Sequence, residues 1–204
     1  MIGSSVKSYG SVGSTSSSLI ELAKAHDQQA WRQLVRLYGP LVDFWIRRPG
    51  LQAADAEDVF QEVFQAVARG IGSFRKDRPG DTFRGWLRTI TRSKVGDFFR
   101  RRAGDPQAVG GSDALQRWQE WAEADSGSSG GEESAAVQGL WLRGLNLIRA
   151  EFEDRTWDMF WRVTVDEQPT GEVAADFGVS AAAVRLAKSR VLRRLREQLG
   201  DAEA

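Results

Sequence analysis

The chain of 204 residues contains no cysteine and only one histidine, His26. The first absence excludes disulfides, thiolate metal sites and a cysteine nucleophile, and the second excludes a multi-histidine metal site. No run of about 18 apolar residues is present, so no membrane-spanning helix is expected, and the Ser/Gly-rich start lacks the apolar stretch of a signal peptide. We therefore expect a cytoplasmic protein without a metal or cofactor.

The sequence also lacks the apolar–polar alternation of β-strands, whereas apolar residues recur at helical spacing. This pattern predicts an all-α fold. Asp27 is a suitable N-cap for one helix, another helix opens at Asp55 and ends near Gly70, and a third begins at Phe83 after a loop. Helical spacing resumes at Leu140 and stops before Pro169.

Composition divides the chain into four segments. Residues 1–18 are of low complexity and are expected to be a disordered tail. Residues 19–102 form a larger helical domain, residues 103–137 an acidic linker, and residues 138–199 a smaller helical domain. Within the linker, LQRWQEWAEA (115–124) predicts a short helix with two exposed tryptophans. The composition of this linker is that of a flexible, solvated spacer.

Charge is balanced overall at 28 basic and 28 acidic residues, but it is sorted along the chain. Residues 69–102 carry eleven Arg and Lys against three Asp, and residues 181–199 carry six against one Glu. Residues 105–137 carry seven acidic residues against one Arg. Two basic segments with an acidic one between them indicate a polyanion that is bound at two places, although each run alone is also typical of a solvated helix face.

The segment TGEVAADFGVSAAAVRLAKSRVLRRLR (170–196) has the spacing of a helix-turn-helix. Gly178 suits the turn, Ser180 suits the next N-cap, and the apolar residues of both helices fall on facing sides. An αα-hairpin shares this spacing, but the strongly basic second helix favours DNA binding. The candidate DNA-binding residues for this helix are Ser180, Ala181, Ala182, Arg185, Lys188, Ser189, Arg190 and Arg193. Arg185 has the geometry to read a guanine, and the later basic residues suit phosphates.

The helix DAEDVFQEVFQAV (55–67) is acidic on one side and apolar on the other. Such a face avoids DNA and suits a basic protein surface, although a solvated face has the same pattern. Its candidate binding residues are Asp55, Asp58, Gln61, Glu62 and Gln65.

The helix that begins at Phe83 has two stripes. Phe83, Trp86, Leu87, Ile90 and Phe98 are expected to face the core, with Trp86 the ambiguous member. The second stripe carries arginines with an aromatic ring among them, which suits single-stranded nucleic acid. With the preceding loop it supplies the candidate DNA-binding residues Phe74, Arg75, Lys76, Arg78, Arg84, Arg88, Arg92 and Phe99.

These motifs together resemble bacterial RNA polymerase sigma factors of the extracytoplasmic-function (ECF) type. DAEDVFQEVF is similar to the family's D-x-E-D-x-x-Q-E-x-F helix, and FRGWLRTITRSKVGDFFR to its F-x-x-W-L-x-x-I-x-x-N-x-x-x-D-x-x-R helix. The resemblance implies that the first helix binds the clamp helices of the polymerase largest subunit. It implies that the second helix opens and reads the minus-ten promoter element, and that the helix-turn-helix reads the minus-thirty-five element.

The resemblance implies a non-enzymatic promoter-specificity subunit in two domains, like sigma region 2 and sigma region 4. Its implied partners are core RNA polymerase (clamp helices and flap), promoter DNA and a possible anti-sigma factor. For the acidic linker, the resemblance implies a place in the nucleic-acid channel of the polymerase, where negative charge mimics RNA, as the alternative to a solvated spacer. The sequence departs from the family at Ser93, where Asn is usual, and at Gly96 inside the helix. Ser93 thereby joins the candidate minus-ten residues. The alternatives are a stand-alone helix-turn-helix regulator, which would not need the acidic helix, and a nucleic-acid enzyme, which the scattered carboxylates disfavour.

Overall fold

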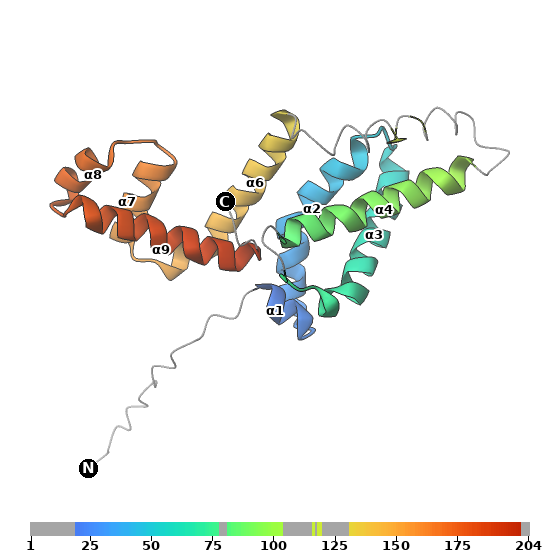
Figure 1. The fold of residues 1–204 in the computed structure, drawn as a ribbon, viewed down its shortest axis with the longest axis horizontal. Coiled ribbons are helices and arrows are strands. Elements are labelled where there is room, and N and C mark those ends of the chain that lie inside the picture. The colour runs from blue at the N-terminus through green and yellow to red at the C-terminus, as the bar shows by residue number, and fades with distance from the viewer. Residues whose placement is uncertain (1–18, 78–80, 104–115, 117, 120–130, 201–204) are drawn as a thin grey trace, which may run out of the picture.

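The computed structural model describes residues 19–77, 81–103, 116, 118–119 and 131–200, and every regular element in these ranges is helical. Figure 1 shows the helices in two groups, α1 to α4 on one side and α7 to α9 on the other, with α6 between them. The expected all-α class is therefore confirmed.

The N-terminal group contains α1 (Leu19–Lys24), α2 (Gln28–Arg47), α3 (Ala53–Gly70), the 3-10 turn η1 (Ile71–Ser73) and α4 (Phe83–Ala103). Asp27 caps α2 as expected, since its carboxylate accepts a hydrogen bond from the backbone N–H of Ala30 at 2.7 Å. The turn after α2 contains Gly50 at φ 91°, a conformation that costs other residues more. α2, α3 and α4 pack on one another and bury Leu34, Leu41, Val59, Val63, Phe83 and Leu87.

The C-terminal group contains α7 (Asp154–Thr164), α8 (Thr170–Phe177) and α9 (Ala181–Leu199). It is preceded by α6 (Gly131–Ile148) and the 3-10 turn η2 (Arg149–Glu151). Gly178 ends α8 in the left-handed conformation at φ 61°, and the Ser180 hydroxyl accepts a hydrogen bond from the Ala183 N–H. Both residues therefore take the turn and cap positions expected of them. α6 begins inside the stretch expected to be linker, because Ala136 and Val137 find apolar partners that the local sequence does not show.

Helix α6 joins the two groups. It packs along α2 on one side and against α9 on the other. A β-carbon at Gly144 would lie 2.7 Å from Leu195, so the glycine allows α6 and α9 to approach closely. Toward α2, Arg143 donates from Nε to the Leu37 carbonyl at 3.1 Å, and burial lowers the pKa of this guanidinium.

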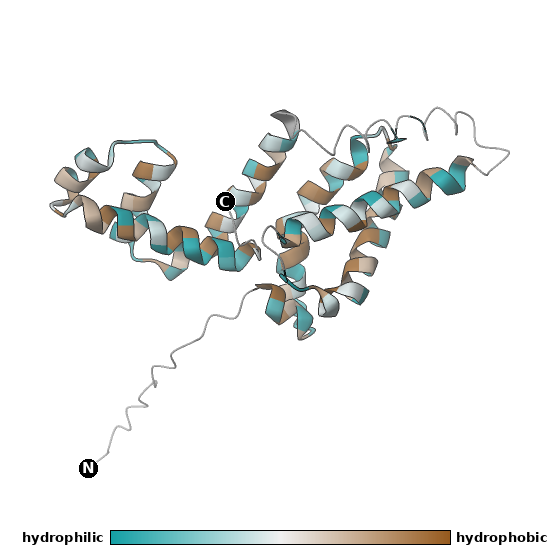
Figure 2. Ribbon diagram, in the orientation of Figure 1, coloured by the Kyte–Doolittle hydropathy of each residue, from teal (hydrophilic) through white to brown (hydrophobic). Residues whose placement is uncertain are grey.

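The end of α9 reaches the N-terminal helices. The Tyr38 hydroxyl donates to the carbonyl of Leu199 at 2.5 Å, which satisfies one of the last carbonyls of α9. Gly200 follows at φ 63°, where a β-carbon would lie 2.8 Å from Ile20 and 3.2 Å from Phe83. The apolar core is consequently continuous between the two groups, and apolar residues run along α6 as well as along the helices on either side of it (Figure 2).

No helix in the described ranges is long and apolar enough to cross a membrane.

Candidate polymerase and nucleic-acid interfaces

The acidic side of α3 lies on the surface, but α4 engages part of it. Asp58, Gln61 and Gln65 are exposed. Asp55 and Glu62 are half-buried, because Arg102 donates to Asp55 at 2.7 Å and Arg101 donates to Glu62 at 2.8 Å. These exposed ion pairs contribute little stability, so a partner that offers better cations can displace the arginines. The freely presented part of this face is therefore Asp58, Gln61 and Gln65.

The buried stripe of α4 differs from the one expected. The residues of α4 that are buried are Phe83, Leu87, Thr91, Val95, Gly96 and Phe99, whereas Trp86, Ile90 and Phe98 are only partly buried. The expectation that Phe99 lies on the DNA-facing stripe is wrong for this structure, since its ring is 3% exposed. The physical reason is Thr91, whose hydroxyl donates to the Leu87 carbonyl at 2.9 Å. Because its hydroxyl is hydrogen-bonded, Thr91 can be buried in the core. The buried stripe therefore continues at every fourth residue, from Phe83 through Thr91 to Phe99.

The other candidates of α4 reach the surface to different degrees. Ser93 is exposed, and Arg84, Arg88 and Arg92 are half-buried. Near the end of this helix, a hydrogen bond from Arg100 lowers the pKa of the Asp97 carboxyl, so this carboxylate stays charged beside the arginines.

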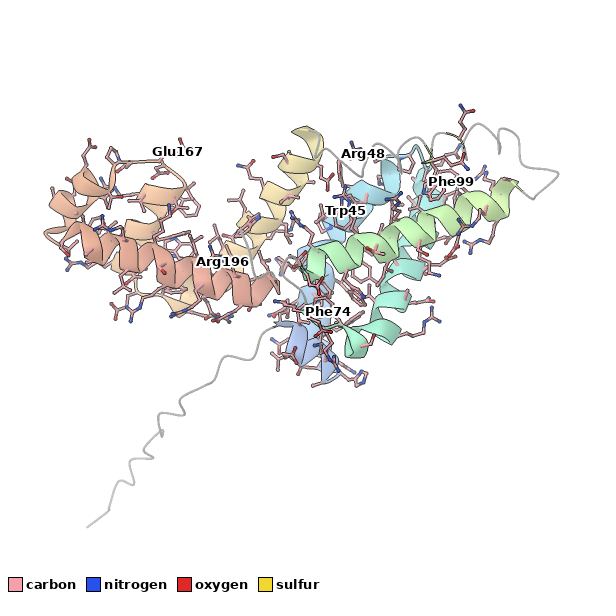
Figure 3. All side chains as sticks on the ribbon, in the orientation of Figure 1. Trp45, Arg48, Phe74, Phe99, Glu167 and Arg196 are labelled. Atoms are coloured by element: carbon pink, nitrogen blue, oxygen red, sulfur yellow. The ribbon has the colours of Figure 1, made fainter. Side chains whose placement is uncertain are left out.

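In the loop before α4, Phe74 is a second residue that was expected to meet DNA but is buried. Phe74, which is labelled in Figure 3, is 5% exposed. Its ring packs against those of Phe83 and Trp86 at ring-centroid distances of 5.5 and 5.3 Å. Its face is therefore not presented for stacking, because it completes an aromatic cluster. Arg75 and Lys76 are exposed, and Arg75 donates to the carbonyls of Gly72 and Phe74. Arg78 lies outside the described residues.

An open cavity of about 430 Å³ lies between this loop and α4. Its lining includes Arg75, Thr82, Trp86 and Thr89, together with the acidic residues Asp77 and Asp81. An aromatic surface beside a cation and hydroxyl groups can hold a flat, polar molecule such as an unpaired base.

Trp118, from the segment expected to be linker, lies on α4. A β-carbon at Gly96 would come within 2.6 Å of its indole ring, and the Arg100 guanidinium lies 6.0 Å from the ring centroid. The expectation of an exposed tryptophan is therefore wrong for Trp118, while Trp121 lies outside the described residues. Gly96 supplies the space that the ring occupies, which gives a physical reason for a glycine inside this helix.

The functional geometry that the sequence did not reveal is centred on Glu133, at the start of α6. Its side chain is buried, and its carboxylate contacts Trp45, Arg48 and Arg88 from the N-terminal helices. Glu133 occurs in a run of acidic residues typical of a solvated linker, so no spacing signal distinguishes it. Arg48 is the C-cap residue of α2 and stands beside Trp45 there (Figure 3).

Helices α8 and α9 form the expected helix-turn-helix around Val173, Ala174, Val184 and Ala187. The candidate residues that point outward and are exposed are Ser180, Ala182, Arg185, Ser189, Arg190 and Arg193. Ala181 and Lys188 are half-buried. Arg194, in contrast, is bonded through two nitrogens to Glu151 at 2.6 and 2.8 Å, so it ties α9 to η2.

The described side chains include no cluster of three or more His, Asp and Glu that could hold a metal ion.

Comparison with known proteins shows which of them this chain resembles. The model of sigma-70 region 2 matches residues 34–104, a range that contains most of α2 and all of α3 and α4. SigD of Mycobacterium tuberculosis and of Mycobacterium bovis, an ECF RNA polymerase sigma factor, is 29% identical over 184 residues, 87% of this chain and 80% of SigD. These comparisons support an ECF sigma factor, since residues 34–104 match sigma-70 region 2 and the chain is similar to SigD and CnrH. Helices α3 and α4 lie within the range that matches sigma-70 region 2, and the helix-turn-helix lies outside it.

The sigma factor CnrH of Cupriavidus metallidurans is 35% identical over 80 residues, and the chain spans only 40% of its length. A solved structure of CnrH in complex with the cytosolic domain of CnrY aligns over 87% of this chain and 92% of CnrH, with 22% identity and a TM-score of 0.36.

Proposed function

We propose that this ECF sigma factor binds core RNA polymerase and directs it to specific promoters by recognising and melting promoter DNA. The observation that carries the proposal is the pairing, inside the sigma region 2 match, of an exposed acidic face on α3 with a basic helix α4 directly beside it. Opposite charges on adjacent helices suit two different partners, a basic protein surface and a nucleic acid.

The polymerase contact is assigned to Asp55, Asp58, Gln61, Glu62 and Gln65 of α3. The proposed partner is the clamp-helix region of the largest subunit, as the family resemblance implies. Because Asp55 and Glu62 already hold Arg102 and Arg101, binding exchanges two intramolecular ion pairs for intermolecular ones. Asp58, which is exposed, makes its contact without that exchange.

The minus-ten contact is assigned to the loop and α4. Arg75 lines the cavity, and Lys76 follows it in the loop. Arg84, Arg88, Arg92 and Ser93 lie on α4, the helix that forms one side of the cavity. Unstacking a base costs a few kcal/mol, and a cavity with an aromatic edge offsets part of that cost. Phe74 and Phe99 act in this proposal as buried supports of the site.

The minus-thirty-five contact is assigned to α9. Ser180, Ala181, Ala182, Arg185 and Ser189 lie at the start of the helix or on its outward face, and Lys188, Arg190 and Arg193 suit phosphates on either side of the groove. The division into residues 19–102 and 138–199, joined by 103–137, is likewise proposed as the functional division. An anti-sigma factor, a protein that inhibits sigma factors, is proposed as a further partner of this chain on the family resemblance alone.

Reconstitution tests the proposal. The purified chain is mixed with bacterial core polymerase, the complex is isolated by gel filtration, and transcription start sites are mapped on genomic fragments. A stoichiometric complex with discrete starts is expected. A chain that binds DNA fragments without any complex with polymerase would instead be a stand-alone helix-turn-helix regulator.

A further inference from the structure

The carboxylate of Glu133 is enclosed by three donors that all come from the N-terminal helices. Arg88 contacts it through two nitrogens, Nη1 at 2.9 Å from Oε1 and Nη2 at 3.0 Å from Oε2. The indole Nε1 of Trp45 donates to Oε1 at 3.3 Å, and Arg48 Nη1 donates to Oε2 at 3.4 Å. Glu133 is 3% exposed, and no other acidic side chain of the described residues is buried.

The three donors form a preorganised anion site. The Arg88 guanidinium lies over the Trp45 ring, 5.8 Å from its centroid, so the indole also contacts this cation. Trp45 is completely buried in the core at the end of α2, and Arg48 is the C-cap residue of the same helix. A planar guanidinium that presents two parallel N–H bonds matches a carboxylate or a phosphate equally well. The carboxylate of Glu133 therefore occupies a site that could also bind a phosphate.

The position of the site indicates which anion it serves. Arg88 lies one helical turn from Arg84 and one from Arg92, so the site continues the basic row of α4. Arg48 and Arg88 each keep 27% of their side chain exposed, so both reach the edge of the contact between the two helix groups. A DNA strand that follows the basic row of α4 passes this edge.

We propose that Trp45, Arg48 and Arg88 bind a backbone phosphate of the single-stranded promoter DNA, and that Glu133 occupies this site while α6 is packed on α2. The inference rests on the proposed function, since it adds Trp45 and Arg48 to the DNA-binding surface and assigns Glu133 as the intramolecular competitor. Phosphate and carboxylate cannot fill the site together. The apparent association constant for DNA is therefore the intrinsic constant multiplied by the fraction of molecules in which Glu133 has left the site.

A purely structural ion pair is the alternative. A buried ion pair is a poor device for stability, because apolar residues of similar size usually stabilise an interface as well or better. A structural pair predicts that loss of Glu133 weakens folding and leaves DNA binding unchanged. The proposal predicts a gain in DNA binding.

The first experiment measures single-stranded DNA binding by the full-length chain. A fluorescein-labelled mixed-sequence oligonucleotide of about 20 nucleotides serves as probe, because phosphate contacts do not depend on sequence. Glu133→Gln keeps the size of the side chain and removes its charge, and we expect it to tighten binding by roughly three- to tenfold. Asp43→Asn is the matched control, since Asp43 forms an exposed pair with Arg47 on the same helix. It is expected to leave the affinity nearly unchanged.

The second experiment asks whether the gain uses the proposed site. In the Glu133→Gln background, Arg48→Ala and Arg48→Gln should each remove the larger part of the gain. Each should also reduce the slope of log affinity against log salt by about 0.7, the value for one phosphate on a single strand. Arg47→Ala, which changes the same charge at the neighbouring position, should retain the gain. A gain that survives both Arg48 variants, or one that Arg47→Ala removes equally, would overturn the site.

The third measurement separates opening from binding. Because the natural chain has no cysteine, labels at Gln29→Cys and Asp158→Cys report the distance between the two helix groups by energy transfer. Glu133→Gln should lower the transfer, and the oligonucleotide should lower it further. Unchanged oligonucleotide affinity in Glu133→Gln overturns the proposal, whether or not the transfer changes.

Two controls define the ligand. Inorganic phosphate at millimolar concentration should compete weakly, and a duplex of the same sequence should gain less from Glu133→Gln than the single strand does. A larger gain for the duplex would contradict the assignment to single-stranded DNA. Failure of the proposed function can be distinguished from failure of this inference. If the proposed function is wrong, the chain neither binds polymerase nor supports transcription, even when the oligonucleotide results are as expected.

Discussion

The indole ring of Trp118 lies over Gly96 so closely that a β-carbon there would stand 2.6 Å from the ring. The ring also lies against the Arg100 guanidinium, and its N–H is buried without an acceptor among the described residues. Trp118 thus contacts α4 at Gly96, one of the two positions of this helix at which the sequence departs from the family pattern.

This contact predicts an energetic coupling between the two residues. Gly96→Ala alone adds helix propensity worth about 1 kcal/mol, but it also displaces the Trp118 ring, so the net gain should be small or negative. In a Trp118→Ala background nothing opposes the new methyl group, and Gly96→Ala should stabilise by about 1 kcal/mol. Urea denaturation of the four proteins measures the coupling. Equal effects of Gly96→Ala in both backgrounds would show that the ring does not occupy this position in solution.

Charge reversal on α3 should weaken polymerase binding. Asp58→Arg places a cation on the exposed acidic face and should raise the dissociation constant for core polymerase at least tenfold, or about 1.4 kcal/mol. Fluorescence anisotropy of the labelled chain measures it. Asp158→Arg, an equally exposed change on α7, is the control. Glu62→Arg tests the same face less cleanly, because it also repels Arg101.

Two arginines of α9 should differ in what they contribute to promoter binding. Arg185→Ala should relax specificity at one base pair of the minus-thirty-five element, at a cost of about 1–3 kcal/mol for the preferred base. Arg193→Ala should weaken binding to all sequences alike and reduce the salt slope by about 1. Binding of the holoenzyme to a promoter library, once its start site is mapped, distinguishes the two. A uniform loss for Arg185→Ala would make it a phosphate contact.

The hydrogen bond between Tyr38 and Leu199 should hold the end of α9 on the N-terminal helices. Tyr38→Phe leaves the buried Leu199 carbonyl without this donor, at a cost of about 1–3 kcal/mol. We expect lower energy transfer between labels on the two helix groups and easier unfolding in urea. A change in unfolding with unchanged transfer would mean that Tyr38 supports its own group alone.

The sequence predicted most of the helices because their signals are local. Asp27, Gly178 and Ser180 act within a few residues of their own position, and their caps and turns appear as expected. The helix-turn-helix core followed from the spacing of Val184, Ala187, Val191 and Leu195, all of which are buried.

The errors have a local cause in one case and a long-range cause in the other. Phe99 is buried because the Thr91 hydroxyl is satisfied within its own helix, which allows the buried stripe to continue past it. The start of α6 and the burial of Glu133 depend on partners roughly 45 to 90 residues away in the chain. Neither helical spacing nor charge counting contains that information.

The contacts of α6 with α2 and α9 also determine how the protein should respond to temperature. α6 meets α2 and α9 mainly through apolar side chains, among them Leu140, Leu145 and Ile148. Apolar contacts weaken on cooling, since their burial carries a large heat-capacity change, whereas the ion pairs of Glu133 do not share that dependence. Separation of the two helix groups should therefore become easier in the cold, and energy transfer between them should fall as the temperature is lowered from 30 °C toward 5 °C, about the range over which hydrophobic stabilisation fades.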